Sequence, residues 1–82
     1  MNMKSMIIEA LGWYGTIAII TAYALVSFSV LQPSGLPYQM LNGTGAIGII
    51  IVSFDKRAWQ PGVLNCLWAL IALIAIGKIV II

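Results

Sequence analysis

The apolar residues of this chain fall into three long runs, which two short polar segments separate. The runs extend from about Ala10 to Leu31, from about Leu36 to Phe54, and from about Trp59 to Ile82. Because an α-helix rises about 1.5 Å per residue, each run is long enough to cross a hydrocarbon layer about 30 Å thick. The pattern therefore predicts an all-α membrane protein with three transmembrane helices.

The two polar segments indicate where the helices begin and end. Residues 31–37 contain Pro33, Gly35 and Pro37, and such a stretch cannot continue a helix. A charge cluster at residues 55–57 ends the second apolar run. Because both joints are short, neighbouring helices are antiparallel, and residues 1–82 form a single integral membrane domain with an up-down-up bundle. We predict helix one at about 6–31 after an N-cap at Ser5, helix two at about 36–54, and helix three at about 59–82.

The N-terminal segment also has features of a secretory signal peptide. Lys4 precedes an apolar stretch, and Ala22-Tyr23-Ala24 imitates a small-residue cleavage site. The apolar run continues beyond Ala24 as far as Leu31, which is more typical of a spanning helix. We therefore predict that this segment is the first membrane helix.

Composition argues against a soluble fold. Hydrophobic residues make up 62% of the chain and the mean hydropathy is +1.09, whereas soluble domains are about 45–50% apolar. A soluble fold of 82 residues would lack the polar surface to cover such a core. We expect the lipid bilayer to surround most of the protein.

Residue types that carry chemistry are scarce. The chain has a single cysteine, Cys66, and no histidine, so a metal site of the Cys/His type is not expected. No nucleophile stands with a base, and the glycines at positions 43–48 follow no predicted strand, which argues against a nucleotide cofactor. Four scattered Lys and Arg residues do not form a nucleic-acid surface. The sequence predicts no enzyme, no metal site and no cofactor.

The charges are distributed unequally over the two sides of the predicted bundle. Lys4, Lys56 and Arg57 fall on one side, and Lys78 falls on the other. Because cytoplasmic loops of membrane proteins carry the excess of Lys and Arg, we expect a cytoplasmic N-terminus. Glu9, near Lys4, is interpreted as an interfacial charge rather than as the buried acid of a small multidrug exporter.

Each predicted helix has one face of small or polar residues and a broad aliphatic face. Within lipid, the hydrophobic effect does not draw helices together, and small residues that allow close approach take over that role. The small-residue faces are therefore interpreted first as packing surfaces. The residues expected to pack are Gly12, Gly15, Thr16, Gly45, Gly48, Ala69 and Ala72.

Two asparagines within the apolar runs are the most informative polar residues. A carboxamide left without partners in hydrocarbon costs several kcal/mol, so Asn42 and Asn65 must face protein or water. One interpretation is hydrogen bonding between helices. The other is a polar cavity that binds a neutral, hydrogen-bonding solute, with Trp68 one turn beyond Asn65 and Tyr23 on the polar face of helix one. Trp68 supplies either a flat apolar face for such a solute or plain packing.

The chain resembles small three-helix bacterial membrane proteins close to the half-SWEET (SemiSWEET) and PQ-loop transporter superfamily. In half-SWEETs each protomer is a three-helix bundle, and two protomers enclose one pathway in which an asparagine of helix three and a tryptophan contact the sugar. The resemblance implies a bacterial inner-membrane protein, assigns the asparagine role to Asn65, and assigns the tryptophan role more loosely to Trp68. The Pro-Gln dipeptide expected in helix one is absent. The resemblance rests on Leu11-Gly12-Trp13-x-Gly15, Ala22-Tyr23, Asn42-x-x-Gly45-Ala46 and Leu64-Asn65-x-x-Trp68.

Two functions of different classes are consistent with these features. The first is a half-size transporter that moves a small neutral polar solute, a sugar or another metabolite, through a homodimer. A second copy is expected because three helices alone enclose no space wide enough for a solute, and a symmetric pair places the polar faces at its two-fold axis. The alternative is a non-transporting membrane subunit or adaptor that packs against a larger membrane protein. Tyr23, Asn42, Asn65 and Trp68 would line the transporter pathway.

Overall fold

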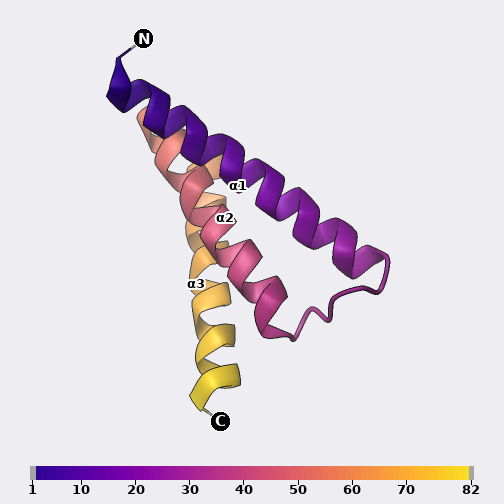
Figure 1. Ribbon diagram of the computed structural model, residues 1–82. Helices are drawn as coiled ribbons and strands as arrows, with labels where there is room; N and C mark the ends of the chain where they lie inside the picture. Colours follow the sequence, from indigo (N-terminus) through magenta and orange to yellow (C-terminus); the bar gives the residue numbers. More distant parts are fainter. Residues whose placement is uncertain (1, 82) are drawn as a thin grey trace.

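Three helices make up the chain in the computed structural model, which describes residues 2–81. They are α1 (Met3–Ser27), α2 (Leu36–Asp55) and α3 (Trp59–Ile81). The all-helical prediction is confirmed, and α2 and α3 begin where the polar segments placed them. Figure 1 shows that the start of α1 lies beside the turn between α2 and α3, whereas the α1–α2 turn and the end of α3 lie at the other end.

α1 begins earlier than the sequence indicated. Asn2 is the N-cap, and its side-chain oxygen accepts a hydrogen bond from the Ser5 backbone N–H at 2.8 Å. The expectation that Ser5 caps the helix is therefore wrong. Asparagine is as good an N-cap as serine, and using Asn2 adds almost one helical turn of intrahelical hydrogen bonds.

α1 also ends earlier, at Ser27 instead of about residue 31. The end is a Schellman motif, in which Ser29 has a positive φ of 63°. Its N–H donates to the Val26 carbonyl at 3.0 Å, and the Val30 N–H donates to the Leu25 carbonyl at 2.8 Å. Glycine is the usual residue at this position, so an apolar run interrupted only by serine gave no sign of the stop.

The same motif ends α2, where it produces the sharp turn into α3. Arg57 has a φ of 58°, and its N–H donates to the Phe54 carbonyl at 3.2 Å. The Ala58 N–H donates to the Ser53 carbonyl at 2.7 Å. Because this turn is so tight, α3 folds back directly along α2.

We predict that Ser29→Gly raises the free energy of unfolding by about 1 kcal/mol. A side chain at a left-handed position costs about that much, and glycine removes the cost. Thermal or denaturant unfolding in detergent measures the change. The control is Ser27→Gly, within the last turn of α1, which should lower stability by about 0.5–1 kcal/mol. A loss of stability in Ser29→Gly would contradict the left-handed end of α1.

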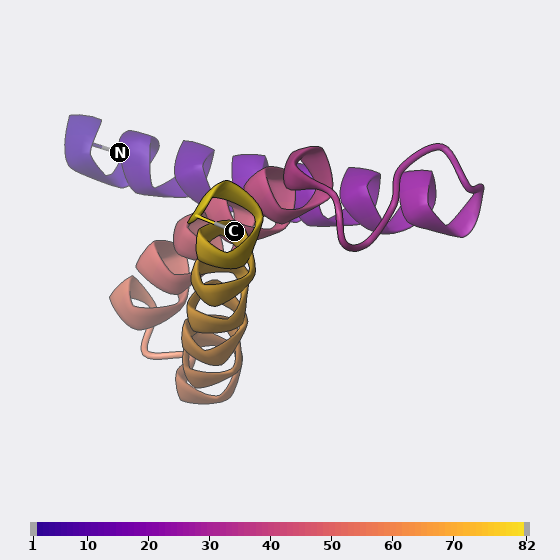
Figure 2. The same ribbon diagram turned by 90° about the horizontal axis from the view of Figure 1, so that it is seen from below.

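The helices do not close into the predicted bundle. α2 lies between the other two and packs against both, and within residues 2–81 no Cα atom of α1 comes within 8 Å of a Cα atom of α3. Figure 2 shows α1 and α3 running in different directions. The reason is that α2 carries small residues toward both neighbours, so the small-residue face of α1 is used up against α2. The protomer is an open, splayed arrangement.

The contact between α1 and α2 is a close approach of two backbones. Gly12, Gly15, Ala18 and Ala22 are the buried residues of α1, and they share one face. A Cβ atom placed on Gly15 would collide with the Gly45 carbonyl oxygen, and one placed on Gly48 would collide with the carbonyl oxygen of Leu11. Gly15 and Gly48, two of the residues that were expected to pack, thus lie where only glycine fits. The α2 residues buried in the protein are Gly45, Ala46, Gly48 and Ser53.

α2 and α3 pack along a second set of small residues. A Cβ on Gly43 would lie 3.2 Å from the Cβ of Ala72, and one on Gly62 would meet the ring of Phe54 at 2.7 Å. The Phe54 ring also packs against Trp59, with centroids 5.8 Å apart. This apolar cluster holds the tight turn between the two helices.

Two of the helices, not three, are long and apolar enough to span a membrane. They are α1, of 25 residues, and α3, of 23 residues. Within their most apolar stretches only 22% and 11% of residues are buried, whereas the core helix of a soluble protein would be mostly buried. α2 has sufficient length but lower hydropathy, because Gln39, Asn42 and Thr44 lie in its first half.

Candidate functional site

The splay of α1 and α3 leaves a groove of about 450 Å³ over the first half of α2. We call it the central groove. α2 forms its floor, and α1 and α3 form its two walls. It is lined by Ile19, Tyr23, Tyr38, Gln39, Asn42, Trp68 and Ile71.

The central groove brings together three of the four side chains that were expected to bind a solute. Tyr23 comes from α1, Asn42 from α2 and Trp68 from α3. Tyr23 is 73% exposed and Trp68 is 41% exposed, so both can be reached from outside the protomer. The lining contains no charged side chain. The groove therefore offers phenol, indole and amide groups to a neutral molecule.

Two further lining residues, Tyr38 and Gln39, were not identified from the sequence. Both lie in the first turn and a half of α2, a region interpreted only as a helix start. Their signal was their spacing from Asn42: residues at i, i+3 and i+4 share a helix face. That relation becomes useful only once the face of α2 that looks into the groove is known.

Asn65 lies outside the central groove. It is only 4% exposed, and its Nδ2 donates to the Pro61 carbonyl of the same helix at 2.8 Å. Its Oδ1 is buried without a hydrogen-bond partner among the described residues. A buried acceptor that lacks a donor costs about 1–3 kcal/mol. Asn65 is thus a destabilising polar group inside the helix packing.

We predict that Asn65→Leu raises the free energy of unfolding by about 1 kcal/mol. Leucine has a similar size and removes the unpartnered oxygen, although it also removes the bond to Pro61. Unfolding in detergent measures the effect. Asn42→Leu, in the groove, is the control and should change stability little. A marked destabilisation by Asn65→Leu would mean that Oδ1 has a partner.

One hydrogen bond between helix side chains was missed by the sequence reasoning, which expected such bonds from the asparagines. The Tyr14 hydroxyl of α1 and the Thr44 hydroxyl of α2 lie 2.6 Å apart. The Thr44 hydroxyl donates to the Met40 carbonyl at 2.7 Å, so the Tyr14 hydroxyl is the donor to Thr44. Tyrosine and threonine hydroxyls are as able as carboxamides to join helices in an apolar setting. Their spacing in the sequence gives no sign of the pairing.

The charged residues other than Lys78 gather at the end opposite the central groove. Glu9 of α1 forms an ion pair with Lys56, at the end of α2. Beside this pair is a second groove of about 240 Å³, in which Trp13 and Thr16 take part. The Thr16 hydroxyl donates to the Gly12 carbonyl at 3.0 Å, so Thr16 satisfies its own polar group instead of bonding to a neighbouring helix.

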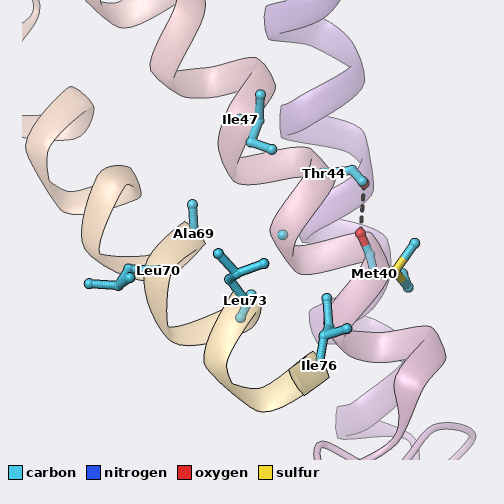
Figure 3. Close-up of a pocket in the computed structure, with 9 residues that line it drawn as sticks. Met40, Thr44, Ile47, Ala69, Leu70, Leu73 and Ile76 are labelled. Atoms are coloured by element: carbon cyan, nitrogen blue, oxygen red, sulfur yellow. Dashed lines mark hydrogen bonds between the residues drawn. The ribbon is translucent and has the colours of Figure 1, made fainter. Parts of the chain in front are cut away.

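A third groove, of about 260 Å³, lies between α2 and α3 and is almost entirely apolar. Figure 3 shows residues that line it, among them Ile47 and Met40 of α2 and Leu73 and Ile76 of α3. Ala69 and Ala72 also line this groove, so the helix-packing role expected of Ala69 is only partly filled within one protomer.

Comparison with known proteins assigns the chain to a family but gives no information about its chemistry. No curated protein and no solved structure matches the chain. Within residues 2–81, no three His, Cys, Asp or Glu side chains come together in a way that could hold a metal ion. A family model matches residues 8–81, which include all of α2 and α3 and most of α1. The chain therefore belongs to this uncharacterised protein family.

Proposed function

We propose that this protein is a half-size membrane transporter that moves a small neutral polar solute through a homodimer. The observation that carries the proposal is the central groove, which gathers Tyr23, Asn42 and Trp68 from three distant parts of the sequence. Side chains of this kind have no reason to converge on a surface that meets only lipid. The motif resemblance to the half-SWEET and PQ-loop superfamily supports the same function.

The outer surface of the helices supports a membrane setting. Aliphatic side chains of α3 outside the grooves are exposed, as Leu67, Ile74 and Val80 illustrate with exposures of 55–66%. A continuous apolar surface of this kind is unfavourable in water and favourable in hydrocarbon. The bilayer is thus the partner that these faces fit.

The lining of the central groove favours a neutral solute. Amide and phenol groups donate and accept hydrogen bonds, and the Trp68 ring offers a flat apolar face. Together they suit a molecule with several hydroxyl groups on an otherwise apolar ring or chain, such as a sugar. An ionic solute would find no opposite charge in the groove.

A second copy completes the site. In a lone protomer the groove is open along its side, and its amides would face hydrocarbon without partners. A two-fold pair of protomers with facing grooves would cover these groups and create a closed pathway. Cross-linking in membranes tests this arrangement, with Tyr23→Cys in a Cys66→Ser background as the reporter. Exclusive recovery of monomers would defeat the transporter proposal.

We further propose that the protein lies in a bacterial inner membrane with its N-terminus in the cytoplasm. Lys4, Lys56 and Arg57 belong to the end formed by the start of α1 and the α2–α3 turn, which fits the positive-inside rule. The central groove then opens toward the outer face. A reporter fused to the C-terminus that was active only in the cytoplasm would reverse this orientation.

The solute-binding test of the proposal is a thermal stability screen of the purified protein in detergent. A ligand that binds the folded state raises the unfolding temperature, and the rise grows with the logarithm of the ligand concentration relative to Kd. We expect at least one neutral sugar or metabolite of a panel to stabilise the wild type, and Asn42→Leu to abolish that gain. A panel without any stabilising compound would count against solute binding.

A non-transporting membrane subunit remains the second candidate, and the apolar groove between α2 and α3 favours it. Its lining of Met40, Ile47, Leu73 and Ile76 could accept an apolar helix of a larger membrane protein. This function predicts co-purification of that protein from native membranes and no solute flux. The transporter function predicts solute flux and no co-purifying larger membrane protein.

A further inference from the structure

Gln39 connects the central groove to the turn between α1 and α2. It lies on α2, lines the groove and is half-buried. Its Nε2 donates a hydrogen bond to the Pro33 carbonyl oxygen at 2.9 Å. Within residues 2–81, no backbone N–H donates to this carbonyl, so Gln39 is its partner.

This bond fixes the orientation of the Gln39 amide. A carbonyl oxygen can only accept, so the amino group of Gln39 must face Pro33 and its Oε1 must face away. Among the described residues Oε1 has no hydrogen-bond partner. Gln39 therefore offers the groove an oriented acceptor, Oε1, and its amino group keeps one N–H besides the one that donates to Pro33.

The support for this amide is rigid. Pro33 has a fixed φ, and the Gly35 N–H donates to the Gln32 carbonyl at 2.9 Å, which closes the turn. Gln39 itself stands in a helix whose first turn contains Pro37. An acceptor held in place before the ligand arrives loses little conformational entropy on binding.

We infer that Gln39 is a specificity-determining residue, which presents a fixed hydrogen-bond acceptor to the central groove and selects solutes that carry O–H or N–H donors. This inference rests on the proposed function. It adds that donors on the solute, and not only its size and neutrality, decide which molecules bind. A solute with acceptors alone would leave Oε1 without a partner in a space closed from water.

The test compares wild type and Gln39→Met with two probe pairs: glucose and myo-inositol against their fully O-methylated forms. Thermal stabilisation in detergent gives the apparent affinity of each probe. We expect the wild type to prefer the hydroxyl form about tenfold, the usual size of one hydrogen bond. Gln39→Met should lose that preference while it binds the methylated forms as the wild type does. Equal weakening of both forms, or a preference that persists in the variant, would overturn the inference.

A second measurement does not need a ligand. Hydrogen exchange of the Gly35 backbone amide, within the turn, should be at least about threefold faster in Gln39→Met because the turn loses its side-chain support. Gln39→Glu, which keeps an acceptor but cannot donate to Pro33, should show the same acceleration. Unchanged exchange in both variants would overturn the fixed orientation. If neither the hydroxyl probes nor any compound of the wider panel stabilises the wild type, the proposed function fails together with this inference. A probe that binds without the Gln39 effect overturns the inference alone.

Discussion

Gly48→Ala is expected to lower the free energy of unfolding by about 3 kcal/mol. The added Cβ would collide with the Leu11 carbonyl group and lie 3.4 Å from the Gly15 Cα. These are backbone atoms of a neighbouring helix, so no side-chain rotation can make room. α1 must move away from α2, and overpacking of this kind costs about 1–3 kcal/mol or more. Denaturant unfolding in mixed micelles measures the loss.

The matched control is Gly77→Ala in α3. Its Cβ would meet no atom within 4 Å, and alanine is about 1 kcal/mol better than glycine within a helix. Gly77→Ala should therefore be neutral or slightly stabilising. If the two substitutions had the same effect, the close approach of α1 and α2 would be wrong.

Trp68→Ala is expected to reduce solute uptake into proteoliposomes by about tenfold or more. The indole ring is the largest surface that α3 contributes to the central groove, and an aromatic face against a sugar-like ring is worth about 1 kcal/mol beyond the area it buries. Because Trp68 is 41% exposed, its removal should not unfold the protein. Helical content and elution volume provide that check.

Trp13→Ala is the control for this result. Trp13 is also an exposed tryptophan within a helix, at 63%, but it lines the groove beside the Glu9–Lys56 pair and not the central groove. Uptake by this variant should remain within about twofold of wild type. Equal losses in both variants would indicate a general effect of tryptophan at the membrane boundary.

The helices were predictable because long apolar runs between proline-containing and charged segments leave few alternatives. The end of α1 was not, because a left-handed Ser29 stops the helix without the glycine that normally marks such a stop. The splay of α1 and α3 was also hidden. It depends on α2 offering Gly45 and Gly48 to one neighbour and Gly43 to the other, and the sequence does not say which face meets which helix.

The candidate site was predictable only in part, because the sequence does not show which face of each helix meets its neighbour. Tyr23, Asn42 and Trp68 stood out as polar or aromatic residues within apolar runs. Asn65 and Trp68 are three residues apart, which places them about 60° apart around a helix axis. Because of this difference, Asn65 is buried in the helix packing, whereas Trp68 lines the central groove. Spacing alone cannot set the rotation of a helix about its own axis.

The most direct test of the central claim is uptake of a panel of labelled neutral sugars and polyols by proteoliposomes that contain only this protein. The account predicts saturable, time-dependent uptake of at least one compound above the level of protein-free vesicles, with loss of that uptake in Trp68→Ala and not in Trp13→Ala. Uptake equal to that of protein-free vesicles for every compound, by protein shown to be folded and inserted, would contradict it.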